Sequence, residues 1–316
     1  MAALLDPDFR KLVRHAEHYH NDGDIVIAAG PLPNSTAFRV HMHILREHSG
    51  VFKDHLAQIP PEEGLVKFDN CPVMAVVDHA DDMAVLLSAL YKGPGFFEGA
   101  KLPIFTVLAL LDLAAKYQVP TITQLAMPHL QFRFPTTFNE WWGDDSEFEP
   151  VEAALSAVVL ARKLGIPTIL PAALYYVCQL PIKTILHGYH REDGKLDKLS
   201  NEDIEKVLEG KENLMNLNAK TNMWVLDIKV PSTSCKTRNI CLPVMKRAAH
   251  LFVETRQMCA YKPFHWVDLN EGGYEDICRP CWRMLCRKRW DGIHGHWCEL
   301  PALMGVEAEV EGWPQE

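Results

Sequence analysis

The feature that most constrains the fold is a pair of short segments separated by a turn. Residues 24–28 (DIVIA) contain a run of β-branched side chains, and residues 37–40 (AFRV) have the pattern of a returning strand. Between them, residues 30–35 combine glycine, proline, asparagine and serine, which are typical of turns. The pattern therefore predicts a β-hairpin with a long loop, and with it a fold that contains a sheet.

Helical and extended patterns alternate after the hairpin. The expected elements are one or two short helices within 44–56, short strands at 65–68 and 73–76, and helices over 79–92 and 106–117. Asp78 is expected to cap the first of the two longer helices, because aspartate accepts hydrogen bonds from exposed backbone N–H groups. This order predicts an α+β domain in which a small sheet is capped by helices.

The middle of the chain contains a weak internal repeat. Residues 113–122 (LAAKYQVPTI) match residues 160–169 (LARKLGIPTI), and each copy combines a helix end with a proline that begins a new helix. The repeat predicts two similar helical hairpins. Ser200 is expected to cap a helix through Leu208, with residues 214–230 continuing the helical region.

Composition and charge exclude several classes of protein. The chain has 316 residues, enough for about two domains, and its net charge of −9 argues against attraction of the whole protein to nucleic acid or an anionic membrane. Residues 165–182 are uncharged, but their three prolines would break the hydrogen bonding that a membrane helix requires. Residues 1–20 carry no secretory leader and are interpreted as a polar helix or tail. We therefore expect a cytoplasmic or nuclear protein with reduced cysteines and no membrane partner.

Two longer stretches resemble a BTB/POZ domain. Residues 24–26 and 38–52 (FRVHMHILREHSGVF) follow the family pattern of phenylalanine, histidine, leucine, serine and phenylalanine, and residues 76–93 resemble its later strand and helix. Four further phrases resemble the BTB proteins of mushroom-forming fungi: NCPV at 70–73, FPTT at 134–137, LPAALY at 170–175 and LPAL at 300–303. The resemblance implies protein–protein interaction, commonly self-association as a homodimer, and no catalysis. The loop over 56–62 departs from the hydrophobic-x-Glu motif of cullin adaptors, which speaks against cullin binding.

The fold class expected is therefore α+β, a BTB/POZ-like small sheet capped by helices, followed by an all-α middle and C-terminal region. The expected segments are an N-terminal helix or tail at 1–20, the BTB/POZ-like domain at 21–130, an acidic linker at 131–150, a helical region at 151–230, a cysteine-rich helical module at 231–300 and an acidic tail at 301–316. By the resemblance, the dimer interface would use the face that contains Asp24, Ile25, Val26, His41 and Leu45.

Four of the nine cysteines form the clearest chemical pattern. Cys278 and Cys281 are a C-x-x-C pair, and Cys235 and Cys241 lie upstream of it. Two residues between thiolates allow both to reach one metal, and tetrahedral zinc needs two more ligands. These four cysteines are the favoured ligand set for a zinc ion. A site with four thiolates has no open position for water, so the role of the zinc would be structural.

Other interpretations of these cysteines stay open. A rival ligand set combines Cys278 and Cys281 with two of Cys286, His294, His296 and Cys298, and burial of reduced thiols without a metal is a third possibility. Thiol–disulfide catalysis is disfavoured, because no strand pattern precedes the C-x-P-C sequence. The chain has no H-E-x-x-H, G-x-S-x-G, Walker A or G-x-G-x-x-G motif, so we expect no enzyme.

A basic stretch near the C-terminus provides the alternative function. Arg279, Arg283 and Arg287 recur at intervals of four residues, interleaved with tryptophans, and would form one face of a helix. That face is typical of solvated helices, with Trp282 and Leu285 turned inward. A DNA-associated transcriptional regulator is the alternative hypothesis, although the acidic chain makes a nucleic-acid partner the less favoured one.

Overall fold

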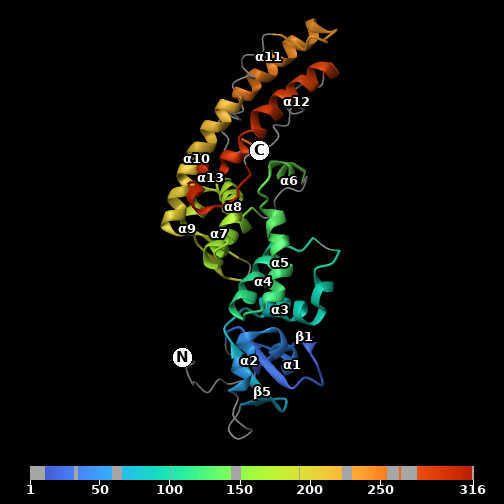
Figure 1. The fold of residues 1–316 in the computed structure, drawn as a ribbon, viewed down its shortest axis with the longest axis vertical. Coiled ribbons are helices and arrows are strands. Elements are labelled where there is room, and N and C mark those ends of the chain that lie inside the picture. The colour runs from blue at the N-terminus through green and yellow to red at the C-terminus, as the bar shows by residue number, and fades with distance from the viewer. Residues whose placement is uncertain are drawn as a thin grey trace. The chain divides into compact units, whose positions relative to one another are not determined.

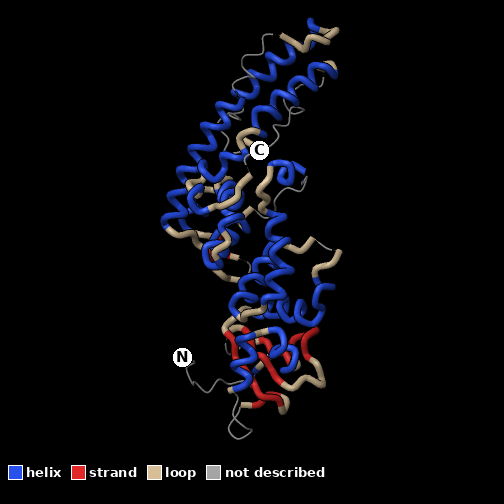
Figure 2. The backbone as a smooth tube through the Cα atoms, in the orientation of Figure 1, coloured by secondary structure: helices blue, strands red, loops and turns tan. Residues whose placement is uncertain are grey.

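The computed structural model divides the chain into two units, Met1–Arg133 and Phe134–Glu316 (Figure 1). The structure describes residues 11–31, 35–58, 66–99, 101–143, 151–191, 193–222, 230–254, 263–264 and 276–314. The fold is mixed, 61% helical, with a small sheet near the N-terminus and helices after it. Figure 2 shows that the strands of this sheet lie in the first unit. None of the described helices is both long enough and apolar enough to cross a membrane.

The sheet of the first unit has five strands in the order β1-β3-β2-β5-β4. The strands are β1 Val13–Tyr19, β2 Ile25–Ala29, β3 Thr36–Val40, β4 Lys67–Phe68 and β5 Cys71–Val76. Strands β2 and β3 pair antiparallel, from Ile25 opposite Val40 to Ala29 opposite Thr36, which confirms the predicted hairpin. Strand β2 also pairs parallel with β5, and all five of its residues are buried. An inner strand covered in this way is uniformly apolar, which is why residues 25–28 lack alternation.

The N-terminal segment corrects one prediction. Residues 13–19, expected within a polar helix or tail, form strand β1, which pairs parallel with β3. Only His18 of this strand is buried, at 7% exposure, and its Nε2 lies 2.7 Å from Ser88 Oγ. With one buried side chain in seven residues, the segment has no apolar stripe to stabilise a helix. The free backbone groups at the edge of β3 decide its conformation instead.

The described residues of the first unit also form five α-helices. They are α1 Met42–His48, α2 Gly50–Ala57, α3 Ala80–Lys92, α4 Ile104–Lys116 and α5 Pro120–Arg133, with a 3₁₀ turn at Gly93–Phe96. The pattern over 44–56 thus forms two short helices, separated at Ser49, whose hydroxyl accepts a hydrogen bond from the Phe52 N–H and begins α2. Helices α3 and α4 confirm the two longer predicted helices.

Asp78 does not have its predicted role. The N-cap of α3 is His79, whose own side chain makes no capping hydrogen bond. The Asp78 carboxylate instead accepts hydrogen bonds from the Tyr117 hydroxyl and from Lys116 Nζ, the latter at 2.5 Å. Burial and, after it, the hydrogen bond to Asp78 raise the pKa of Tyr117 far above its usual value of 10.0. The contact links the start of α3 to the end of α4.

The second unit is mostly helical. Its helices are α6 Phe138–Gly143, α7 Ala153–Leu164, α8 Leu170–Val177, α9 Ile182–His187, α10 Asn201–Asn222, α11 Arg238–Glu254, α12 Arg279–His294 and α13 Leu300–Leu303, with 3₁₀ turns at Pro167–Ile169, Trp297–Glu299 and Glu307–Glu309. A two-residue antiparallel pair, β6 Tyr189–His190 and β7 Leu196–Asp197, corrects the expectation that this region is all-α. Ser200 accepts a hydrogen bond from the Asp203 N–H, so the predicted cap is confirmed, and α10 extends well beyond Leu208.

The internal repeat has a common backbone geometry. Gln118 and Gly165, which occupy the same position in the two copies, have φ angles of 53° and 65°. The next residue in each copy donates a backbone hydrogen bond five residues back, from Val119 to Ala114 and from Ile166 to Ala161. This is the Schellman pattern that ends a helix. The following proline begins α5 in the first copy and, in the second, a 3₁₀ turn that leads into α8. Each copy therefore forms the sharp turn of a helical hairpin, as predicted.

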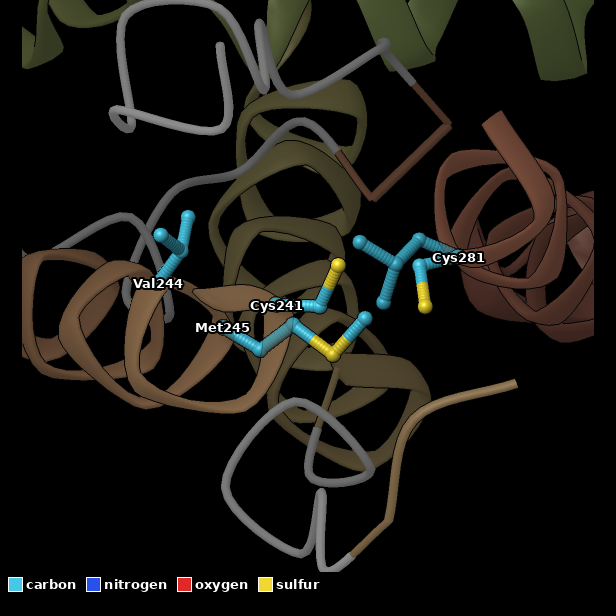
Figure 3. Close-up of a cluster of buried hydrophobic side chains, with 5 residues drawn as sticks. Cys241, Val244, Met245 and Cys281 are labelled. Atoms are coloured by element: carbon cyan, nitrogen blue, oxygen red, sulfur yellow. The ribbon is translucent and has the colours of Figure 1, made fainter. Parts of the chain in front are cut away.

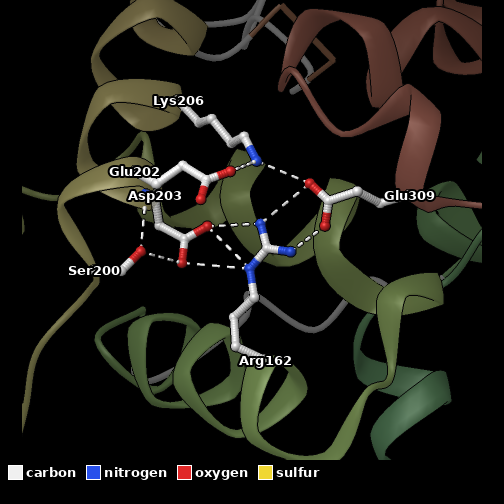
Figure 4. A network of polar contacts seen from close by, with 6 residues as sticks. All are labelled: Arg162, Ser200, Glu202, Asp203, Lys206 and Glu309. Atoms are coloured by element: carbon white, nitrogen blue, oxygen red, sulfur yellow. Dashed lines mark hydrogen bonds and ion pairs between the residues drawn. The ribbon is translucent and has the colours of Figure 1, made fainter.

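A polar network ties three segments of the second unit together (Figure 4). Arg162 of α7 lies between Asp203 of α10 and Glu309 near the C-terminus, and donates hydrogen bonds to both carboxylates. Lys206 adds a bond of 2.8 Å to Glu309. The network is mostly shielded, because the side chain of Asp203 is only 4% exposed. It holds the C-terminal segment against the helices of this unit.

Candidate metal centre

Four cysteines come together at the adjacent ends of two helices. Cys235 lies in the loop before α11 and Cys241 in the first turn of α11, while Cys278 is the N-cap of α12 and Cys281 lies in its first turn. Their four Sγ atoms all lie within 4.8 Å of one another. Among the residues that the structure describes, this is the one group of three or more histidine, cysteine or acidic side chains with metal-binding spacing. The four cysteines could therefore hold one metal ion.

The local backbone explains how each cysteine reaches the site. Thr237 accepts backbone hydrogen bonds from Ile240 and Cys241, so the chain turns into α11 directly after Cys235. Cys278 has an extended backbone, with φ −68° and ψ 153°, and Pro280 lies in the first turn of α12. Proline is favoured at this position because its fixed φ suits a helix and its missing N–H costs nothing there. The C-x-x-C sequence is thus a loop-to-helix corner.

The site is supported by a small apolar cluster between α11 and α12. Cys241, Val244 and Met245 of α11 pack with Cys281 and Leu285 of α12, and all five are buried. Figure 3 shows Cys241 and Cys281 reaching from their two helices into the space between them. The part of this cluster that the structure describes is too small to form a domain core of its own, which is the situation in which small modules use a metal.

Hydrogen bonds and burial distinguish the four thiols. The hydrogen bond from the Cys281 backbone, followed by contacts with the neighbouring thiols, lowers the pKa of Cys278 to about 7. Burial raises the pKa of Cys281 well above its usual value of 9.0. Cys241 Sγ accepts a hydrogen bond from the Cys278 N–H at 3.3 Å and lies 3.2 Å from Thr237 Oγ1. The positive ends of the α11 and α12 dipoles lie beside the site, where they stabilise thiolates.

The rival ligand set does not assemble in the described residues. His294 and Cys298 lie at or beyond the far end of α12, about 24 Å along the helix from Cys278 at 1.5 Å per residue. His296 lies 2.8 Å from Glu299, and Cys298 Sγ contacts the Gly295 carbonyl at 3.2 Å. Spacing in the sequence allowed both sets, and among the described residues only the first set comes together.

Comparisons with known proteins identify no relative. No family model, no curated protein and no solved structure matches this chain.

The residues expected at a dimer interface lie mostly inside the first unit. Ile25, Val26 and Leu45 have 0% exposure in this single chain. Strand β2 is an inner strand with a partner on each edge, and the interface assignment stays a prediction. Asp24 is exposed and accepts a hydrogen bond from the Met42 N–H at 2.6 Å. His41 is half-buried, with Nδ1 2.7 Å from the Tyr91 hydroxyl. Self-association itself stays a prediction.

The arginines of α12 divide into two groups. Arg279, Arg283 and Arg287 are exposed along one face, as their spacing predicts, and nucleic-acid binding by this face stays a prediction. Arg289 is only 3% exposed and donates a hydrogen bond of 2.7 Å to the Pro263 carbonyl. Burial lowers the pKa of Arg289 to about 10. The structural role of this arginine was missed, although its position four residues after Leu285 places it on the buried face of α12.

Some predictions lie outside the described residues. They concern residues 59–62 of the cullin-contact motif, residues 144–150 of the acidic linker and residues 223–229 of the helical continuation.

Proposed function

We propose that the C-terminal module of this chain is built around one structural zinc ion held by Cys235, Cys241, Cys278 and Cys281. The observation that carries the proposal is the spacing of the sulfurs. A tetrahedral site with Zn–S bonds of about 2.3 Å has sulfurs about 3.8 Å apart. Cys278 Sγ and Cys235 Sγ lie 3.7 Å apart, and no pair of the four exceeds 4.8 Å. A shift of about 1 Å by the most distant thiols would complete the tetrahedron.

The donor set favours zinc and a structural role. Thiolate ligands select zinc over magnesium or calcium, which prefer oxygen. Four thiolates around Zn²⁺ leave no position for a water, so the ion would support no hydrolysis. It would instead join α11 to α12, and its binding free energy would become folding free energy of the module.

We infer that the whole chain is a non-enzymatic interaction protein of the BTB type that works in the cytoplasm or nucleus. The order of elements in the first unit supports this proposal, with a hairpin, two short helices, further strands and three helices in sequence. Its basic interaction would then be self-association, and it would recruit other proteins as an adaptor.

Elemental analysis of the purified full chain tests the zinc proposal. We expect about one zinc per chain after purification in a reducing buffer. The Cys278→Ser variant should lose zinc, whereas Cys298→Ser, a cysteine of α12's C-terminal flank outside the cluster, should retain it. Cobalt substitution provides a second measurement, because thiolate-to-cobalt absorption appears only when the sulfurs coordinate the metal. A protein that neither contains zinc nor binds added zinc or cobalt would refute the proposal.

Light scattering tests the interaction proposal. The full chain should have a mass above that of one chain, 35.8 kDa, at micromolar concentration. A strictly monomeric mass across the concentration range would refute self-association.

A further inference from the structure

The four cysteines of the metal centre are not equivalent in their exposure. Cys241 and Cys281 have 0% exposure and belong to the apolar cluster between α11 and α12. Cys235 and Cys278 are partly exposed. The pair on the α11 side, Cys235 and Cys241, therefore contributes one accessible and one buried cysteine. The pair on the α12 side, Cys278 and Cys281, does the same.

The two accessible sulfurs are also neighbours. Cys278 Sγ lies 3.7 Å from Cys235 Sγ, although 43 residues separate them in the chain. A disulfide bond requires about 2.05 Å, so the sulfurs need to approach by less than 2 Å. Cys235 belongs to a loop, which can supply this movement more easily than the helical Cys241.

We propose that Cys235 and Cys278 are the oxidisable pair of the metal centre and that a peroxide releases zinc by joining them as a disulfide. The inference rests on the proposed zinc site and adds a mode of regulation to it. Cys241 is a poor candidate for either member of the oxidisable pair, because it is buried. Its sulfur accepts a hydrogen bond from the Cys278 N–H and lies beside the Thr237 hydroxyl.

The chemistry balances with hydrogen peroxide as the oxidant. One of the two thiolates attacks a peroxide oxygen, which breaks the O–O bond and forms a sulfenic acid and hydroxide. The second thiolate attacks that sulfur, forming the S–S bond and expelling a second hydroxide. Two protons convert the hydroxides to water, so two thiolates are oxidised by two electrons and one peroxide is reduced. Zinc retains only Cys241 and Cys281, two ligands of the four that a structural site needs, and it leaves.

The disulfide preserves part of the structure. It links the loop before α11 to the N-cap of α12, the same two segments that the metal joins. Oxidation would therefore exchange one cross-link for another instead of unfolding the module. Reduction of the disulfide with zinc present would restore the original site.

The experiment begins with the zinc-loaded full chain. Graded hydrogen peroxide is added, released zinc is measured with a colorimetric chelator, and the disulfide is located by peptide mass spectrometry after blocking free thiols. We expect one Cys235–Cys278 disulfide for each zinc released, and recovery of the site with dithiothreitol and zinc.

Two matched variants sharpen the result. Cys235→His keeps four ligands of a type that zinc accepts but removes one oxidisable sulfur, and should slow peroxide-driven release by about tenfold or more. Cys241→His retains the accessible pair and should release zinc at nearly the original rate. The disulfide map of the unmodified chain decides the question if either variant fails to load zinc.

The two failures are distinguishable. If the chain binds no zinc at the start, the zinc site itself is refuted. If zinc binds and peroxide releases it with a disulfide between Cys278 and Cys281, or between Cys241 and Cys281, the site stands and the inference is wrong. Retention of zinc under peroxide would overturn the inference in the same way.

Discussion

Replacing Glu309 with glutamine tests the polar network that holds the C-terminal segment of the second unit. Glu309 accepts hydrogen bonds from Arg162 of α7 and, at 2.8 Å, from Lys206 of α10. Glutamine has nearly the same shape and retains one acceptor oxygen, so Glu309→Gln removes the negative charge and little packing. The change should destabilise the second unit, because two cations lose a shared partner.

The structure sets the size of the effect. A hydrogen bond to a charged group contributes about 1.5–3 kcal/mol when shielded, whereas an exposed ion pair contributes about 0–1 kcal/mol. The Glu309 side chain is 32% exposed, between these two cases. Arg162 keeps Asp203 at 2.7 Å, so it is not left as an isolated charge. We expect the free energy of unfolding to fall by about 1–2 kcal/mol.

Tryptophan fluorescence during urea unfolding is the appropriate assay. All eight tryptophans of the chain lie in the second unit, so their signal reports that unit alone. Glu311→Gln is the matched control, because this substitution removes the same charge from the same segment at a residue that is exposed. The control should change the free energy of unfolding by less than about 0.5 kcal/mol. Equal effects of the two substitutions would refute the role of the network.

The pH dependence provides an independent check. Partial burial raises the pKa of Glu309, but hydrogen bonds from Arg162 and Lys206 outweigh it, and the net pKa is lowered below 4.5. A carboxyl with a lowered pKa contributes stability above its unfolded pKa, and this stability is lost as the pH falls through the folded pKa. The difference between the original chain and Glu309→Gln should therefore be constant near neutral pH and shrink below about pH 4.5. A difference that persists undiminished in acid would contradict the electrostatic explanation.

Three further changes have definite expected outcomes. Lys211→Met should lower the free energy of unfolding of the second unit by about 1–3 kcal/mol, because the buried Lys211 Nζ donates hydrogen bonds to the Cys178 and Leu180 carbonyls. In the same urea assay, Lys220→Met should be nearly neutral, because Lys220 is exposed. Burial and, after it, the charge of neighbouring His15 lower the pKa of His18 below 6.5. The stability that neutral His18 contributes is therefore present above pH 6.5 and is lost as the pH falls through the lower pKa of the folded state. Hydrogen-exchange protection of β1 should therefore drop on acidification, and His18→Gln should reduce that drop. Removal of zinc by a chelator should lower the helical circular dichroism of the full chain, and Cys278→Ser should abolish that response.

Elements with a short-range signal could be predicted from the sequence. The hairpin of β2 and β3, the two short helices separated at Ser49 and the Ser200 cap depend on residues within a few positions of one another. Side-chain period, turn residues and hydrogen-bonding caps all act over this range. The four cysteines were also predicted as a set, because thiolates have a distinctive chemistry wherever they lie.

Elements that depend on a distant partner were missed. Strand β1 exists because β3 presents a free edge, and its own residues carry no apolar pattern. Asp78 has the chemistry of a helix cap, but Tyr117 and Lys116 occupy its carboxylate instead. The complete burial of Ile25 and Leu45 likewise depends on the strands and helices around them.

The sequence by itself determined the local elements and the identity of the candidate metal donors, because periodicity, capping and thiolate chemistry belong to neighbouring residues or to single side chains. Only the tertiary structure decided which donors meet. Packing of α11 against α12 joins Cys235 and Cys241 to Cys278 and Cys281, and the length of α12 separates these from His294 and Cys298. The same holds for Arg162 and Glu309, which are 147 residues apart and become neighbours only through the packing of the helices between them.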